Sequence, residues 1–165
     1  MATTSLCVGL LLNQFRDKPL PLVYQSKQER LEQAVSRIAA SEAPKHNSAT
    51  GPFSQNLSLD EFRVFVKEKR GLVLDVRPEI FHRLGHVPGA LSLPREDFEK
   101  SYARLKSKLE TDKNQPIVLY CPGGSCDDSE LVQKGLVRLG YTQVVVFRGG
   151  WTAWTQAGLP EEKTR

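Results

Sequence analysis

The chain has 165 residues, of which 39% are hydrophobic and 25% charged, so it can form one soluble domain with a core and an appendage. The net charge of +4 and a pI near 9.0 would suit a nucleic-acid partner. However, the basic residues are scattered among nearly as many acidic ones, with no basic run or interleaved aromatics. We therefore expect no nucleic-acid partner, and only a mild preference for anionic substrates.

The N-terminal residues contain a short apolar run, Leu6–Leu12. It is too short to span a bilayer, and it lacks the positive lead and small-residue cleavage site of a secretory signal. We interpret it as a buried segment and expect a cytoplasmic protein without membrane association. If the N-terminus is incomplete, a membrane-anchored or periplasmic protein is the alternative.

Residues 26–40 are predicted to form a helix. Ser26 and Glu29 have the spacing of a capping box, and Leu31, Val35 and Ile38 fall on one stripe. Residues 41–56 are rich in Ser, Ala, Pro, Asn and Gly, which predicts a flexible linker. We expect an N-terminal extension over 1–56, a domain over 57–160 and a tail over 161–165.

From Leu57 onwards, helical and strand patterns alternate. A second capping box, Ser58 and Glu61, begins a predicted helix. A continuous apolar run from Gly71 predicts a strand buried on both faces. The remaining elements expected are a short strand at 90–93, a helix from Phe98, a strand ending at Tyr120, a helix over 127–139 stopped by Gly140, a strand at 143–150 and a last helix that begins at Gly150.

This alternation predicts an α/β fold with a central parallel sheet flanked by helices on both faces. Ligands of such sheets bind outside the carboxyl ends of the strands. Cys121 directly follows a predicted strand and precedes a helix, so it occupies that position.

The stretch from Val118 to Ser129, VLYCPGGSCDDS, can form an anion-binding loop. Gly123 and Gly124 permit tight turning, and successive backbone N–H groups could face inward at the start of the next helix. Such a field favours the thiolate, which would make Cys121 a nucleophile. The alternative from the residues alone is a tight turn that buries an inert thiol.

Three separated stretches resemble the rhodanese-like domain family: LVLDVRPEIFHRLGHVPGALSLP, IVLYCPGGSC and VVVFRGGWTAWTQAGLP. They occur in the family's order and cover about residues 57–160, leaving the N-terminal third uncovered. The resemblance implies the rhodanese α/β fold and a sulfurtransferase that carries sulfur as a persulfide on Cys121. It implies a small sulfur donor and an acceptor thiol, free or on a protein. The implied substrate-binding loop is Pro122, Gly123, Gly124, Ser125 and Cys126.

One departure from the family pattern concerns the sulfur donor. Many members that use thiosulfate have an arginine five residues after the catalytic cysteine, where this chain has Cys126 followed by Asp127 and Asp128. Without that cation a dianionic donor loses about 1.5–3 kcal/mol of charge-assisted hydrogen bonding, so thiosulfate is in doubt. The two acids are expected to help cap the following helix.

The role of Cys126 stays open between two alternatives. It could be a resolving thiol that attacks the persulfide on Cys121, or it could fill a small site at the helix start. The cysteines Cys7, Cys121 and Cys126 form an odd set without disulfide-framework or zinc spacing. We expect a reducing compartment, and no metal or cofactor.

Four further residues are assigned supporting roles. Asp75 and Arg77 flank a strand end, where they are expected to pair or to orient the loop. His86 is expected to tie loop backbone together rather than act as a base. Arg148 is the spare cation for an anionic substrate, although a surface ion pair is the preferred interpretation.

Two other functions remain as alternatives to a sulfurtransferase. A dithiol redox protein would use Cys121 and Cys126. A non-catalytic rhodanese-like module would use the loop or the segment 6–40 to bind a partner. The retained cysteine argues against the module, and the missing arginine argues for it.

Overall fold

The computed structural model describes residues 25–41 and 57–164. The expectations for the apolar run, for Cys7 and for the linker fall outside these residues. The elements in chain order are α2 (Lys27–Ser41), α3 (Leu59–Lys67), β1 (Leu72–Asp75), α4 (Glu79–Leu84), β2 (Leu91–Ser92), α5 (Phe98–Leu109), β3 (Ile117–Tyr120), α6 (Asp128–Arg138), β4 (Val144–Phe147) and α7 (Gly150–Gln156). No helix in the described ranges has the length and apolar character needed to cross a bilayer.

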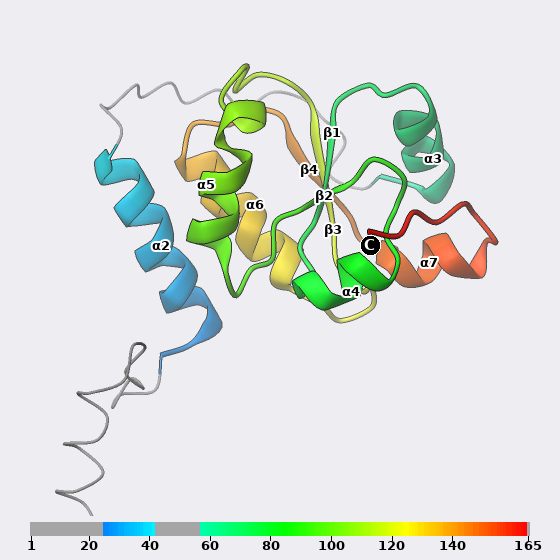
Figure 1. Ribbon diagram of the computed structural model, residues 1–165, viewed down its shortest axis with the longest axis horizontal. Coiled ribbons are helices and arrows are strands. Elements are labelled where there is room, and N and C mark those ends of the chain that lie inside the picture. Colours follow the sequence, from blue (N-terminus) through cyan, green and yellow to red (C-terminus); the bar gives the residue numbers. More distant parts are fainter. Residues whose placement is uncertain (1–24, 42–56, 165) are drawn as a thin grey trace, which may run out of the picture.

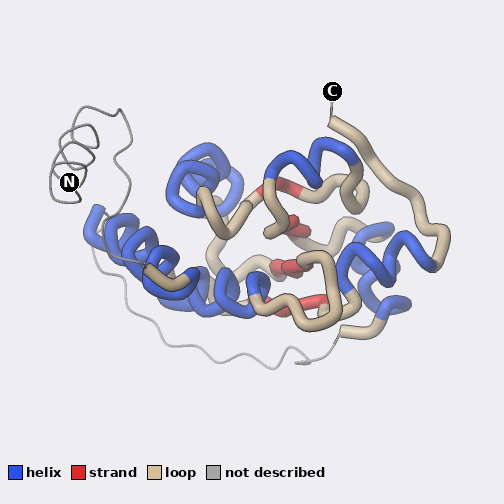
Figure 2. Tube along the Cα trace, turned by 90° about the horizontal axis from the view of Figure 1, so that it is seen from below, coloured by secondary structure: helices blue, strands red, loops and turns tan. Residues whose placement is uncertain are grey.

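The four strands form one parallel sheet in the order β2-β1-β3-β4. Helices α2, α5 and α6 cover one face and α3 and α7 the other, so the strands lie between two helical layers (Figures 1 and 2). Every residue of β3 and β4 is buried, as expected for strands covered on both faces. The predicted α/β fold is confirmed.

Local sequence signals account for the helix starts. Ser58 accepts a hydrogen bond from the backbone N–H of Glu61, whose carboxylate accepts one from the N–H of Ser58, so the predicted capping box forms. The same reciprocal pair joins Ser26 and Glu29 at the start of α2. These bonds satisfy N–H groups that have no partner inside the helix.

Helix α2 packs onto the domain rather than standing apart from it. Its stripe of Leu31, Val35 and Ile38 is buried in the same core cluster as residues of α5 and α6. Lys27, at its start, also reaches Asp128 at the start of α6, with 3.3 Å between Nζ and Oδ1. Part of the predicted extension therefore completes the core on the α5–α6 face.

Helix α4 was not predicted. It has six residues and follows Pro78, and its apolar side chains Ile80, Phe81 and Leu84 are largely exposed. A segment this short has no room for the repeated apolar stripe that marks a helix in sequence.

Candidate functional site

Cys121 lies at the carboxyl end of β3, directly before the loop that leads to α6. Its side chain belongs to the core cluster on the α2–α5–α6 face and is only 2% exposed. The Ser129 hydroxyl, in the first turn of α6, donates a hydrogen bond to Sγ over 3.4 Å. The thiol in turn lies 3.6 Å from the carbonyl oxygen of Cys126. The sulfur is thus held between the end of the loop and the start of the helix.

The loop reverses direction at two glycines with positive φ, Gly123 at 105° and Gly124 at 66°. Gly123 also lies against the turn before α7: a Cβ there would lie 2.4 Å from the carbonyl oxygen of Gly149. The backbone N–H of Trp151 donates to the carbonyl of Cys121 over 2.8 Å. The start of α7 therefore fixes the backbone of the cysteine loop.

Cys126 returns to the vicinity of Cys121 and is half-buried. Burial raises the pKa of its thiol to about 12, helped by a hydrogen bond with the Cys121 side chain and opposed by the Asp128 backbone N–H. Cys126 consequently keeps its proton at neutral pH. Both cysteines are free thiols.

The hydrogen-bond donors of the loop differ from the predicted set at Pro122. Pro122 has no N–H, so it cannot donate; its carbonyl instead accepts from the N–H of Thr152 over 3.0 Å. Within the described part of the chain, no backbone N–H of the loop hydrogen bonds to Sγ of Cys121, whose polar contacts are with Ser129 and Cys126. Gly124 and Ser125 are exposed at the loop's tip.

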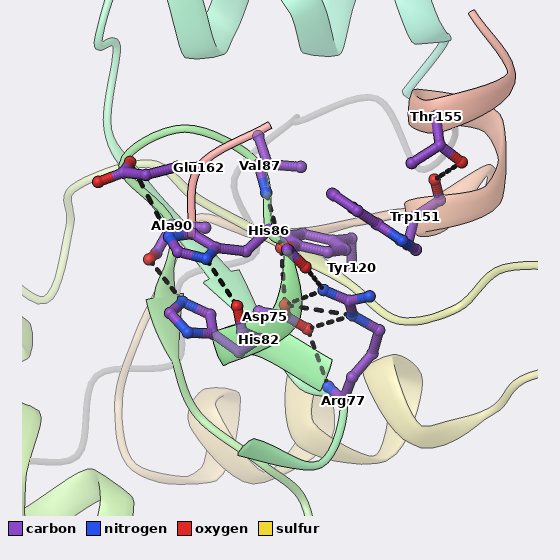
Figure 3. A network of polar contacts seen from close by, with 11 residues as sticks. Asp75, Arg77, His82, His86, Val87, Ala90, Tyr120, Trp151, Thr155 and Glu162 are labelled. Carbon is purple, nitrogen blue, oxygen red and sulfur yellow. Dashed lines mark hydrogen bonds and ion pairs between the residues drawn. The ribbon is translucent and has the colours of Figure 1, made fainter. Parts of the chain in front are cut away.

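Asp75 and Arg77 pair with each other at the end of β1, the strand beside β3. The guanidinium Nη2 lies 2.7 Å from Oδ2 of Asp75, and Nε lies 3.0 Å from Oδ1 (Figure 3). The Tyr120 hydroxyl donates to the same carboxylate over 2.8 Å, because the strand register places Asp75 beside Tyr120. Asp75 and Tyr120 are fully buried, and Arg77 is 4% exposed.

This pairing decides what Arg77 can do. Burial lowers the pKa of its guanidinium, but the hydrogen bond and charge of Asp75 outweigh that effect, so the net shift is upward. Its cation is already neutralised, and its Cζ lies 4.5 Å from the centroid of the Trp151 ring, which it stacks against (Figure 3). Trp151 binds the Cys121 carbonyl through its N–H. Trp151 thus contacts Arg77 through its ring and the cysteine loop through its backbone N–H.

His86 makes structural contacts. Its Nδ1 lies 2.7 Å from the carbonyl of His82, and the two imidazole rings stack with centroids 3.7 Å apart (Figure 3). Its backbone forms an antiparallel bridge with Glu162, whose carboxylate accepts from the N–H of Gly89. These contacts join the predicted tail to the loop after α4. Among the described residues, no hydrogen bond or ion pair joins His86 or Glu162 to Cys121.

Arg148 and the acidic residues Asp127 and Asp128 were each assigned a role from the sequence, and the structure gives each assignment a different outcome. Arg148 is exposed and pairs with Glu130, with 2.6 Å between Nη1 and Oε1, so the surface ion pair is what forms. The expected capping by Asp127 and Asp128 is wrong, because no side chain caps α6. Asp128 turns instead to Arg95, whose Nε lies 2.8 Å from Oδ1, a close charge pair without hydrogen-bond alignment.

Three residues of this region were missed by the sequence reasoning: Ser129, Tyr120 and Arg95. Ser129 is 1% exposed and Arg95 is 6% exposed. Ser129 had a local signal, since it falls in the first helical turn after the loop. Tyr120 and Arg95 had no such local signal. Strand register and the course of the loop bring them to their partners, Asp75 and Asp128.

No cluster of three or more His, Cys, Asp or Glu side chains that could hold a metal occurs among the described residues. The chemistry-bearing groups near the sheet's carboxyl edge are instead two thiols, a hydroxyl and two neutralised arginines. Such a set suits nucleophilic sulfur chemistry.

Comparison with known proteins agrees with this geometry. Residues 58–157 match the rhodanese-like domain, so the chain belongs to the rhodanese-like domain family. It is 33% identical over 106 residues to the tRNA uridine(34) hydroxylase of Chlamydia caviae, covering 62% of this chain and 31% of that protein. It is also 33% identical over 116 residues to the adenylyltransferase and sulfurtransferase MOCS3 of Drosophila sechellia, covering 68% of this chain and 25% of that protein.

A solved structure gives the same result. The rhodanese-like domain of the Alr3790 protein from Anabaena sp. superposes with a TM-score of 0.53 at 28% identity, covering 66% of this chain and 77% of that one. The chain spans a third or less of the length of the curated relatives named above. Their activities therefore belong to larger proteins.

Proposed function

We propose that this domain is a sulfurtransferase that carries sulfane sulfur as a persulfide on Cys121. The observation that carries the proposal is the position of its sulfur at the carboxyl end of a central strand, with the Ser129 hydroxyl donating to it. A hydroxyl donor favours the thiolate over the neutral thiol, and the thiolate is the form that attacks a sulfur donor.

The donor must reach a sulfur that is 2% exposed. The loop of residues 122–127 contacts this sulfur through the Cys126 carbonyl, most of the loop is exposed, and its tip carries no large apolar side chain. In this proposal the donor reaches Sγ when the loop opens, a movement that costs little apolar burial.

The charges near the loop disfavour a donor whose reacting group is a compact dianion. Arg77 and Arg95 are paired with Asp75 and Asp128, and Arg148 is paired with Glu130. A dianion such as thiosulfate would therefore meet no unpaired cation among these arginines. The acceptor in this proposal is a thiol, on a small molecule or on a protein.

Intact mass spectrometry tests the function. Protein carrying Cys126→Ser, in which Cys121 is the remaining thiol of the site, is incubated separately with glutathione persulfide, mercaptopyruvate and thiosulfate. We expect a gain of one sulfur atom with glutathione persulfide, a smaller yield with thiosulfate, and no gain in Cys121→Ser. Absence of any sulfur gain with all three donors, in protein shown by circular dichroism to be folded, would contradict the proposal.

The contact between the two thiols also favours the second candidate, a dithiol redox protein. It predicts an intramolecular disulfide after mild oxidation in the absence of any sulfur donor, with a measurable reduction potential. Two thiols that stay titratable after treatment with glutathione disulfide would remove this candidate.

A further inference from the structure

The two described cysteines face each other across the turn of the loop. The positive φ angles of Gly123 and Gly124 fold the chain back, so that the carbonyl of Cys126 lies 3.6 Å from Sγ of Cys121. Burial, together with interaction with the Cys121 side chain, raises the pKa of the Cys126 thiol, so the two side chains are close enough to affect each other. Two side chains in such contact can reach disulfide geometry by a small movement of one exposed loop.

We propose that Cys126 is the resolving thiol of this site: it attacks Sγ of the Cys121 persulfide and releases the carried sulfur as hydrosulfide. The inference rests on the proposed persulfide of Cys121. It adds a second catalytic residue and a second product, because the sulfur leaves the protein without an external acceptor thiol.

The step balances without an added oxidant. A bond forms between Sγ of Cys126 and Sγ of Cys121, while the bond between Sγ of Cys121 and the terminal sulfur breaks and leaves its electron pair on that sulfur. The thiol proton of Cys126 moves to the departing sulfur, which leaves as HS⁻. Cys126 is oxidised, the departing sulfur is reduced, and a dithiol reductant or two molecules of a thiol such as glutathione restore the free cysteines.

The Cys126 thiol has to give up its proton as its sulfur attacks, and the departing sulfur is the group that takes this proton. Burial, followed by the hydrogen bond with Cys121, raises the pKa of the Cys126 thiol to about 12. The proton is therefore still present beside the site when the persulfide forms. An anionic persulfide would otherwise have to expel S²⁻, a very poor leaving group, whereas a proton delivered by the attacking thiol allows HS⁻ to leave.

Ser129 restricts which sulfur is attacked. Its hydroxyl lies 3.4 Å from Sγ of Cys121 and is itself buried, so it holds Sγ at the start of α6. The terminal sulfur then has to extend away from Ser129, and Cys126 meets Sγ. Attack at Sγ forms the disulfide, whereas attack at the terminal sulfur would only move the sulfane sulfur to Cys126.

The test follows one turnover in the full chain with Cys7→Ser, so that only the two site thiols react. The protein is loaded with glutathione persulfide, desalted at once, and followed by intact mass and by colorimetric sulfide release, without added thiol. Cys126→Ser and Cys126→Ala are compared in the same background. Incubation with glutathione disulfide in place of the persulfide controls for simple oxidation.

We expect the Cys126-containing protein to lose the added sulfur and two hydrogen atoms while releasing one sulfide per disulfide formed, and peptide mapping to join Cys121 to Cys126. Both Cys126 variants should keep the added sulfur at least about tenfold longer. A persulfide equally long-lived with and without Cys126 would overturn the inference and leave the proposed function standing. If no variant gains sulfur at all, the proposed function itself fails.

Discussion

At the scale of single residues, the two buried arginines near the site are each paired with a carboxylate. Arg77 is held by Asp75, and Arg95 by Asp128, each with little exposure to water. A buried cation without a partner would attract anions from solution. Burying it unpaired would also lower the free energy of unfolding by several kcal/mol. With both arginines paired, the Ser129 hydroxyl is the group that donates a hydrogen bond to Sγ of Cys121.

His82 is the residue whose protonation should affect stability. Burial lowers the pKa of its imidazole, an effect only partly offset by the carbonyl of Ala90, 3.0 Å from Nε2. The folded protein therefore favours the neutral ring, and the unfolded chain binds the proton more readily. The stability contribution is complete above pH of about 6.5 and is lost as the pH falls through the lower pKa of the folded state.

Urea unfolding of wild type and His82→Gln at pH 7.5 and 5.0 checks this effect. Wild type should lose more unfolding free energy between the two pH values than the variant does. Carboxylates titrate in both proteins, so the difference between the two curves isolates His82. Equal losses would show that this imidazole is not held neutral by the fold.

At the scale of elements, the cysteine loop depends on its packing against the turn before α7. Gly123→Ala would place a Cβ 2.4 Å from the carbonyl of Gly149 at a φ of 105°, whereas Gly124→Ala meets nothing within 4 Å at a φ of 66°. We expect losses in unfolding free energy of about 3 kcal/mol or more for the first and about 1–2 kcal/mol for the second.

Chemical denaturation gives the free energies, and persulfide formation on Cys121 gives the functional consequence. Gly123→Ala should also slow sulfur loading, because the turn that it displaces carries the Trp151 N–H bound to the Cys121 carbonyl. Identical stability of the two variants would mean that the contact between the two loops relaxes freely.

The elements that sequence predicts well are those with local signals. The capping boxes at Ser26 and Ser58 mark helix starts, and the unbroken apolar runs of β3 and β4 mark strands buried on both faces. The site is predicted less completely. Cys121 follows from its place after a strand, but the bond from Tyr120 to Asp75 depends on strand register, which no local pattern encodes.

Ion-pair partners that are far apart in the chain also cannot be predicted from a local sequence pattern. Asp128 has the residue type and position of a helix-capping group, yet Arg95, more than thirty residues earlier, attracts its carboxylate. A charge pair of this kind contributes more free energy than one capping hydrogen bond. No residue within the loop indicates that the pair will form.

At the scale of the whole molecule, the domain is larger than the segment that matches the family. The match covers residues 58–157, while α2 lies before it and packs on α5 and α6 (Figure 1). Leu31 and Val35 of α2 are both 4% exposed. Helix α2 therefore contributes to folding, and through Lys27 and Asp128 it also touches the start of α6 beside the site.

Leu31→Ala tests that contribution, with the exposed Gln33→Ala as its matched control on the same helix. Removing the buried side chain should lower the unfolding free energy by about 2–5 kcal/mol, and the control by no more than about 0.5 kcal/mol. Denaturant titration measures both. A Leu31→Ala protein as stable as the control would mean that α2 is only loosely associated in solution.

The most direct measurement of the central claim locates the added sulfur on the chain. Cys126→Ser protein is loaded with glutathione persulfide, trapped with an alkylating reagent and digested, and its peptides are sequenced by mass spectrometry. The account predicts an alkylated persulfide on the peptide that contains Cys121. Sulfur found only on Cys7, or a Cys121 peptide that never carries it, would contradict the account.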